Sequence, residues 1–182
     1  MRINAGKFRN HNIDITNLPT TRETSDKVRQ AIFNMIGQFF DGGKALDLFA
    51  GSGAMGFEAY SRGISKIVLN DINKDVILVC KKNAMKLKCI DDVTLLNMDY
   101  KNAIESLKDN KFDLIFLDPP YAMQNVDEII NLIDINNLQN DGAILSFEME
   151  KKTSCSETIG SYNLIKDRIY GIKRVCIYRK ES

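Results

Sequence analysis

From residue 44 onward, short apolar runs alternate with segments whose apolar residues recur at helical spacing. The apolar runs predict buried strands at Ala45–Phe49, Lys66–Leu69, Val93–Leu96, Phe112–Leu117 and Ala143–Phe147. The segments between them predict helices at Ala54–Arg62, Lys74–Lys86, Asn102–Leu107 and Val126–Leu132. Strands separated by helices of this length form βαβ units, so the pattern predicts a parallel sheet in an α/β fold.

The two ends of the chain have different patterns. Residues 1–16 predict a small extended hairpin, with Ile3 on one side and Ile13 and Ile15 on the other. An amphipathic helix follows, with apolar positions Val28, Ile32, Met35, Ile36 and Phe39, closed by Asp41-Gly42-Gly43. Asn163–Tyr170 and Arg174–Tyr178 predict a closing antiparallel hairpin around Gly171.

These elements predict one domain over residues 1–182, with a doubly wound, Rossmann-like core and a mostly parallel twisted sheet. Residues 1–24 form an N-terminal hairpin and polar segment, and residues 25–182 form the helix and the core. In such folds, ligands bind beyond the carboxyl ends of the strands.

Composition adds little to this picture. The chain is 44% hydrophobic and 27% charged, with a net charge of +1, which is ordinary for a soluble globular protein. A near-neutral total argues against a free nucleic-acid binder unless the charge is segregated. Cations do cluster up to residue 30, although a solvated surface explains them equally well: Arg2, Lys7, Arg9, Arg22, Lys27 and Arg29 against Asp14, Glu23 and Asp26.

The cysteines indicate a compartment rather than a metal site. Cys80, Cys89, Cys155 and Cys176 are too far apart for a Cys-x-x-Cys clip, and His11 is the only histidine, so we expect no metal. Four free thiols without a secretory leader predict a reducing cytoplasm. No apolar run approaches the roughly 18–20 residues that span a membrane.

A glycine-rich turn follows the first core strand. Gly51, Gly53 and Gly56 satisfy the G-x-G-x-x-G pattern, and Asp71 ends the next strand. Glycines permit a tight strand-to-helix turn and let a ligand approach the backbone. The turn permits NAD, FAD or S-adenosylmethionine, and a purely structural turn is the alternative.

Carboxylates around this turn favour S-adenosylmethionine. The negative charge of Asp47 would repel a pyrophosphate, but it suits a cationic sulfonium and ammonium. We expect Asp71 to accept hydrogen bonds from both ribose hydroxyls. Asp99 is placed to take the adenine amino group, with Ile72 and Tyr100 flanking the ring, although a helix N-cap explains Asp99 equally well.

The fourth strand ends in Asp118-Pro119-Pro120-Tyr121, which matches the [Asp/Asn/Ser]-Pro-Pro-[Tyr/Phe/Trp] motif of amino-group methyltransferases. A strand terminator is the alternative explanation of the two prolines. An exocyclic base amine is a poor nucleophile because its lone pair is delocalised into the ring. Acceptors out of the ring plane, here the Asp118 carboxylate and the Pro119 carbonyl, pyramidalise the nitrogen and stabilise its developing charge. Tyr121 is expected to stack on an unpaired or extruded base.

With both motifs in place, the chain resembles the RsmD family of bacterial 16S ribosomal-RNA (guanine-N2)-methyltransferases from Met1 to about Lys180. Residues 22–34, RETSDKVRQAIFN, resemble the family's Arg-Pro-Thr-Thr-Asp-Arg-Val-Arg-Glu-x-Leu-Phe-Asn signature, and residues 47–63 resemble its glycine segment. Two residues depart from the pattern: Glu23 replaces the usual proline, and Asn10-His11 stands where a Gly-Arg pair is common.

The resemblance implies a class I methyltransferase fold and a role for each motif. It implies catalysis by Asp118, Pro119, Pro120 and Tyr121, and S-adenosylmethionine binding by Asp47, Phe49, Ala50, Gly51, Ser52, Gly53, Asp71, Ile72, Asp99 and Tyr100. It also implies RNA contacts from the N-terminal hairpin and the substrate entrance, at Lys7, Arg9, Arg22 and Thr24.

The implied enzyme is a cytoplasmic monomer that uses no metal. Its substrate is 16S rRNA, expected within a partly assembled small ribosomal subunit, where ribosomal proteins supply contacts that a nearly neutral enzyme lacks. Three rivals stay open on the residues alone: an adenine-N6 methyltransferase acting on DNA or RNA, a nicotinamide-dependent oxidoreductase, and a non-catalytic RNA-binding assembly factor.

Overall fold

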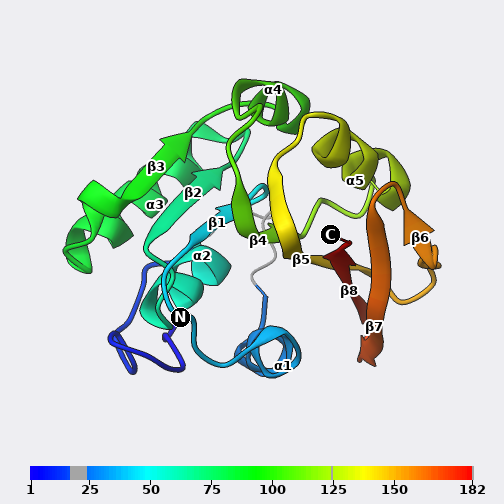
Figure 1. Ribbon diagram of the computed structural model, residues 1–182. Helices are drawn as coiled ribbons and strands as arrows, with labels where there is room; N and C mark the ends of the chain where they lie inside the picture. The colour runs from blue at the N-terminus through cyan, green and yellow to red at the C-terminus, as the bar shows by residue number, and fades with distance from the viewer. Residues whose placement is uncertain (17–23, 124, 182) are drawn as a thin grey trace.

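A single eight-stranded sheet organises the chain, which is described by a computed structural model over residues 1–16, 24–123 and 125–181. The strands lie in the order β3-β2-β1-β4-β5-β8-β7-β6 (Figure 1). Neighbours from β3 to β5 are parallel, whereas β5, β8, β7 and β6 pair antiparallel. The mostly parallel α/β fold with a C-terminal antiparallel hairpin is therefore confirmed.

The parallel half alternates strands with helices, as the hydrophobic pattern predicts. Its strands are β1 (Lys44–Asp47), β2 (Lys66–Asn70), β3 (Val93–Leu96), β4 (Phe112–Leu117) and β5 (Gln139–Glu150). Its helices are α2 (Ala54–Ser61), α3 (Lys74–Lys86), the 3₁₀ turn η1 (Ile90–Asp92), α4 (Tyr100–Ser106) and α5 (Val126–Ile135). Helix α1 (Asp26–Ile36) precedes this half, and β6 (Thr158–Ile159), β7 (Tyr162–Tyr170) and β8 (Lys173–Lys180) follow it.

The sheet separates two apolar clusters. On one side, Phe33 of α1, Phe57 of α2 and Ala84 of α3 pack together. On the other, Ile104 of α4 and Ile130 of α5 pack against the opposite face of the same strands. Helices therefore cover both faces, and only the ends of the strands are left open for a ligand.

Two element predictions need correction. The first helix was expected to run to Phe39, but α1 ends at Ile36 and Phe39 is 66% exposed. Gly37, at φ +129°, ends the helix because that conformation suits glycine, and its N–H donates to the Phe33 carbonyl. The fifth strand is longer than Ala143–Phe147, because β5 continues to pair with β8 as far as Glu150.

The N-terminal segment folds back on α2 instead of projecting into solvent. Its hairpin is reduced to one antiparallel bridge, Arg2 with Asn12; Ile13 is buried, whereas Ile15 is exposed. The Glu58 carboxylate of α2 accepts from the backbone N–H groups of residues 4 and 5 and from the buried side chain of Arg29. Arg29 is thus an internal ion-pair partner and adds no charge to the basic N-terminal surface.

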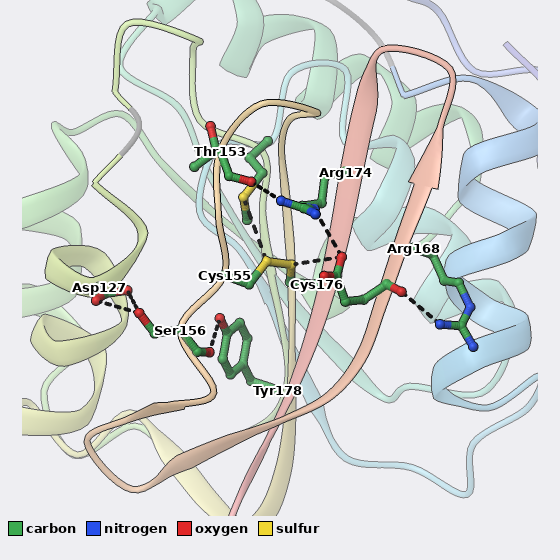
Figure 2. Close-up of a disulfide and its surroundings, with 10 residues drawn as sticks. Asp127, Thr153, Cys155, Ser156, Arg168, Arg174, Cys176 and Tyr178 are labelled. Carbon is green, nitrogen blue, oxygen red and sulfur yellow. Dashed lines mark hydrogen bonds and ion pairs between the residues drawn. A yellow bond between two sulfur atoms is a disulfide. The ribbon is translucent and has the colours of Figure 1, made fainter.

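A disulfide joins the turn after β5 to β8 (Figure 2). Cys155 is bonded to Cys176, so the expectation of four free thiols is wrong for this pair; Cys80 and Cys89 are free and buried. The two cysteines are 21 residues apart in the sequence, so their spacing did not predict that the turn folds back onto β8. Asp167 lies beside the two sulfurs, but a cysteine in a disulfide offers no thiolate to a metal.

No helix within the described ranges is both long and apolar enough to cross a membrane.

Candidate active site

A pocket of about 590 Å³ opens at the carboxyl ends of β1, β2 and β4. Its size is typical of sites for small ligands. One side is formed by the glycine turn after β1, and the facing side by the residues that end β4 and β5. Most predicted site residues line it: Thr24, Asp47, Phe49, Ala50, Gly51, Asp71, Ile72, Asp99, Tyr100, Asp118, Pro119, Pro120 and Tyr121.

The three glycines of the turn have different roles. Gly51 lines the pocket, and its N–H donates to Asp71 Oδ2 at 3.2 Å. Gly53 begins α2 at φ +83°, and a Cβ there would lie 2.6 Å from the Phe57 ring. At Gly56 a Cβ would lie 2.4 Å from Leu69 Cδ2. Gly53 and Gly56 are therefore needed for packing; neither they nor the fully buried Ser52 are among the residues lining the pocket.

Asp47 is a buried carboxylate beneath the turn. It is 3% exposed and accepts a hydrogen bond from Gly56 N at 3.3 Å. Burial raises the pKa of Asp47 to about 8, against the lowering effect of that hydrogen bond. A buried carboxylate in a pocket, with a pKa that burial shifts this far from its ordinary range, is a candidate ligand-binding residue.

Asp71 and Asp99 lie at the ends of β2 and β3. Asp71 also accepts from Asn73 N at 2.9 Å, and burial raises its pKa despite both backbone hydrogen bonds. Asp99 caps α4 by accepting from Lys101 N at 2.9 Å, while also lining the pocket. The capping explanation and the ligand explanation of Asp99 are thus compatible. Tyr100 is buried against Phe49, whereas Ile72 is 72% exposed at the pocket edge.

Two pocket-lining polar atoms are buried without a hydrogen-bond partner among the described residues: Asn70 Oδ1 and Ser146 Oγ. Buried polar atoms in native proteins are almost always paired, so a polar ligand is expected to complete this site.

Asp118 belongs to a buried network that reasoning from the sequence missed. Lys173 Nζ lies 3.0 Å from Asp118 Oδ2 and 2.8 Å from Glu148 Oε2. The Thr24 hydroxyl lies 3.2 Å from the same Asp118 oxygen and 3.0 Å from Glu148 Oε1. A cation and a hydroxyl therefore each bridge two carboxylates that would otherwise repel one another.

This network has consequences for proton affinity. Burial raises the pKa of Asp118, while the Lys173 charge opposes the shift. Burial and the charge of Asp118 raise the pKa of Glu148 to about 7. Burial lowers the pKa of Lys173, but the two carboxylates outweigh it and the net shift is upward. Lys173 is therefore held as a cation at neutral pH.

The four residues predicted to contact substrate do not gather together. Thr24 lines the pocket, and Arg22 lies outside the described residues. Lys7 lines a separate hollow of about 340 Å³ with Lys66, the first residue of β2, and its Nζ lies 3.6 Å from the centre of the Tyr60 ring. Arg9 is exposed on the same N-terminal segment. Lys7 and its hollow thus lie at the amino end of the strands, away from the pocket.

Comparisons with known proteins find relatives over nearly the whole chain. The profile of the family described as conserved hypothetical protein 95 matches residues 1–179. Ribosomal RNA small subunit methyltransferase D of Haemophilus influenzae is 31% identical over 181 residues, covering 98% of this chain and 93% of the relative. The namesake protein of Escherichia coli K12 is 29% identical over 184 residues, covering 100% and 91%.

Solved structures share the fold. A conserved hypothetical protein of Streptococcus pyogenes has a TM-score of 0.81 and 40% identity, covering 84% of this chain and 95% of that chain. SMU.776, a methyltransferase complexed with SAH, has a TM-score of 0.68 and covers 84% of this chain and 48% of that chain, but at 11% identity the likeness is in fold alone. The family profile spans nearly the whole chain, and the chain therefore belongs to the RsmD family.

Proposed function

We propose that this protein transfers the methyl group of S-adenosylmethionine to the exocyclic N2 amine of a guanine in 16S ribosomal RNA. The names of its relatives, small subunit rRNA methyltransferases, support an enzyme that methylates rRNA. The reaction class is supported independently by the pocket, which combines a glycine turn with a carboxylate-diproline segment.

The cofactor half of the pocket suits S-adenosylmethionine. Asp47 is placed to interact with a sulfonium and an ammonium, and a cation beside it favours the ionised form of this carboxyl, whose pKa burial raises to about 8. Each Asp71 oxygen accepts one backbone hydrogen bond and keeps lone pairs for the ribose hydroxyls. Asn70 Oδ1 is a further acceptor at the same wall. When bound, the cofactor supplies an electrophilic methyl group.

The amine half orients the nucleophile. Lys173 and Thr24 both engage Asp118 Oδ2, and Oδ1 makes no hydrogen bond to a described residue. Oδ1 is thus available to accept one amine N–H, and the Pro119 carbonyl the other. Held in this way, the nitrogen directs its lone pair at the methyl, and the Asp118 charge stabilises the positive charge that develops on it.

The observation that carries the proposal is the Asp118 carboxylate, fixed by Lys173 inside the pocket that the glycine turn lines. Glu148, 3% exposed beside it, favours guanine over adenine. The Watson–Crick edge of guanine presents adjacent N1–H and N2–H donors, which suit two adjacent carboxylates. The corresponding edge of adenine presents an N1 lone pair, which Glu148 repels once it is ionised above its pKa of about 7. Adenine N6 is the alternative product.

The substrate context is part of the proposal. The net charge is only +1, so sequence-independent attraction to phosphate is modest. We infer that the enzyme acts as a monomer on a partly assembled small subunit that presents the target base already accessible. Its expected location in the cytoplasm follows from this substrate, because the Cys155–Cys176 disulfide removes the argument from four free thiols. Presentation of this kind reduces the cost of extruding the base.

The test is methylation of small subunits purified from a strain that lacks the enzyme, using labelled S-adenosylmethionine and nucleoside mass analysis. We expect N2-methylguanosine; N6-methyladenosine would establish the alternative. Asp118→Ala is expected to lower the single-turnover rate about 10²–10³-fold, while cofactor affinity measured by calorimetry stays close to wild type. Normal turnover by this variant would mean that another group orients the amine.

A further inference from the structure

Two segments beyond the pocket continue its wall. Lys151 follows β5 directly, and its N–H donates to the Ile172 carbonyl at 2.8 Å, in the turn between β7 and β8. Glu148 and Lys173, which line the pocket, lie three residues before Lys151 and one residue after Ile172. At about 3.3 Å per residue of strand, these segments lie within about 10 Å of the proposed catalytic network.

Basic side chains on these segments and along β7 form no ion pair with a described residue. We call Lys151, Lys152, Lys166 and Arg168 the basic rim. All four are exposed, and none forms an ion pair with a described residue. Some lysines elsewhere on the surface do form ion pairs: Lys66 pairs with Asp92, Lys82 with Asp14 and Lys101 with Glu128.

Strand register directs part of the rim toward the pocket side. Arg168 of β7 lies opposite Val175 of β8, and Tyr170 lies opposite Lys173. Side chains two residues apart point to the same face of a sheet, so Arg168 and Tyr170 share the face on which Lys173 reaches Asp118. A cation and an aromatic ring thus extend the side of the sheet that carries the network.

Ile172 adds an apolar contact point. It is 67% exposed at the tip of the β7–β8 turn, directly beside Lys151. A basic surface that served solubility alone would not need a large exposed apolar side chain at its centre. An apolar tip among cations suits a nucleic acid strand, which offers both phosphates and the faces of its sugars and bases.

The N-terminal cations lie at the other end of the molecule. Helix α2 begins at Ala54, which lines the pocket, and ends at Ser61, whose carbonyl accepts from Lys7 N at 2.8 Å. Its 8 residues separate the two ends by about 12 Å. The N-terminal segment is therefore at the amino edge of the sheet, whereas the basic rim is at the carboxyl edge with the pocket.

We propose that the basic rim binds the phosphates of the RNA strand next to the methylated nucleotide, an inference that rests on the proposed function. The target base enters the pocket, and the strand that carries it crosses the end of β5 and the β7–β8 turn. Contacts of this kind position the strand without reading its sequence.

The experiment compares three variants that each remove three positive charges. The rim variant is Lys151→Gln, Lys152→Gln and Arg168→Gln, and the N-terminal variant is Arg2→Gln, Lys7→Gln and Arg9→Gln. The control is Lys81→Gln, Lys88→Gln and Lys108→Gln, at exposed sites that form no ion pair with a described residue. Binding to naked 16S RNA is titrated between 50 and 200 mM salt, alongside thermal stability and S-adenosylmethionine affinity.

Because each phosphate contact with a single strand contributes about 0.7 to the slope of log K against log salt, the rim variant should lower that slope by about 2. The control and the N-terminal variant should match wild type, and all three should keep wild-type cofactor affinity. A wild-type slope in the rim variant, a loss in the N-terminal variant instead, or a loss seen on subunits but not on naked RNA would overturn the inference. The last result would assign the rim to a ribosomal protein. If the wild-type enzyme methylates no RNA, the proposed function itself fails.

Discussion

Lys173→Met removes the cation that bridges Asp118 and Glu148. Lys173 is 13% exposed and lies 3.0 Å from Asp118 Oδ2, where two unit charges attract by about 5 kcal/mol at an effective dielectric constant of 20. Since one pKa unit corresponds to about 1.36 kcal/mol, losing even a third of that attraction raises the carboxyl pKa by more than about one unit. Asp118 is then protonated over a wider pH range and no longer accepts an amine hydrogen bond.

The assay is single-turnover methyl transfer between pH 5.5 and 9. The Lys173 cation favours the ionised carboxylates, so its removal shifts the acid limb of the pH–rate profile to higher pH. We expect Lys173→Met to lose about 10²-fold or more at pH 7 and to recover part of that loss at pH 9. Cofactor affinity should change little.

Two further variants separate the electrostatic explanation from simple misfolding. Lys173→Arg keeps the cation and should keep an acid limb close to that of wild type. Lys180→Met removes another lysine of β8, paired with the exposed Asp141 at 3.2 Å, and should change neither the rate nor the profile. If Lys173→Met has the wild-type rate and the wild-type profile, the network does not control Asp118.

Three other predictions concern the cofactor site and stability. Asp71→Ala should weaken S-adenosylmethionine binding in calorimetry, and an unchanged dissociation constant would remove Asp71 from the site. Asp47→Asn should raise the free energy of unfolding of the ligand-free protein at pH 8 by more than about 1 kcal/mol. The pKa of Asp47 is raised from 3.8 to about 8 in the folded state, so its carboxylate lowers stability as pH rises between these two values. Denaturant titrations at pH 5 and pH 8 check this, and an equal difference between variant and wild type at both pH values would refute it. Reducing the disulfide between Cys155 and Cys176, which closes a loop of 21 residues, should lower the free energy of unfolding by about 3 kcal/mol. The measurement compares the oxidised protein with Cys155→Ser, which cannot form the disulfide.

Local patterns were enough to predict the parallel half of the fold and the cofactor side of the pocket. Strand β4, for example, has the predicted bounds because five of its six residues are apolar and the polar residues Lys111 and Asp118 flank it. The glycine turn and the Asp118–Tyr121 segment lie at strand ends, and parallel strands bring their carboxyl ends to one edge. Position in the sequence therefore placed most of these residues at the pocket, although Ser52 and Gly53 are buried and do not line it.

Glu148 and Lys173 could not be placed in the same way. They meet because β8 returns antiparallel beside β5, and the register of that pairing depends on the whole C-terminal hairpin. The available signal was Glu148 itself, a lone acid inside the buried run of β5. The position of Lys7 could not be predicted either, since a cation near the start of the chain carries no information about which edge of the sheet it will reach.

The charged side chains of the pocket are mostly acidic, whereas those of the basic rim beside it are positive. Asp47, Asp71, Asp99, Asp118 and Glu148 line the pocket, and Lys173 is the one lysine among the described residues that lines it. Even with some of these acids protonated, such a pocket attracts a cationic cofactor and repels phosphate. An RNA strand is therefore expected to insert only an uncharged base and to keep its backbone outside, where cations are needed to bind its phosphates. In a chain whose net charge is only +1, those cations have to be concentrated at the pocket mouth, and unpaired basic side chains lie there on the β5 and β7–β8 ends.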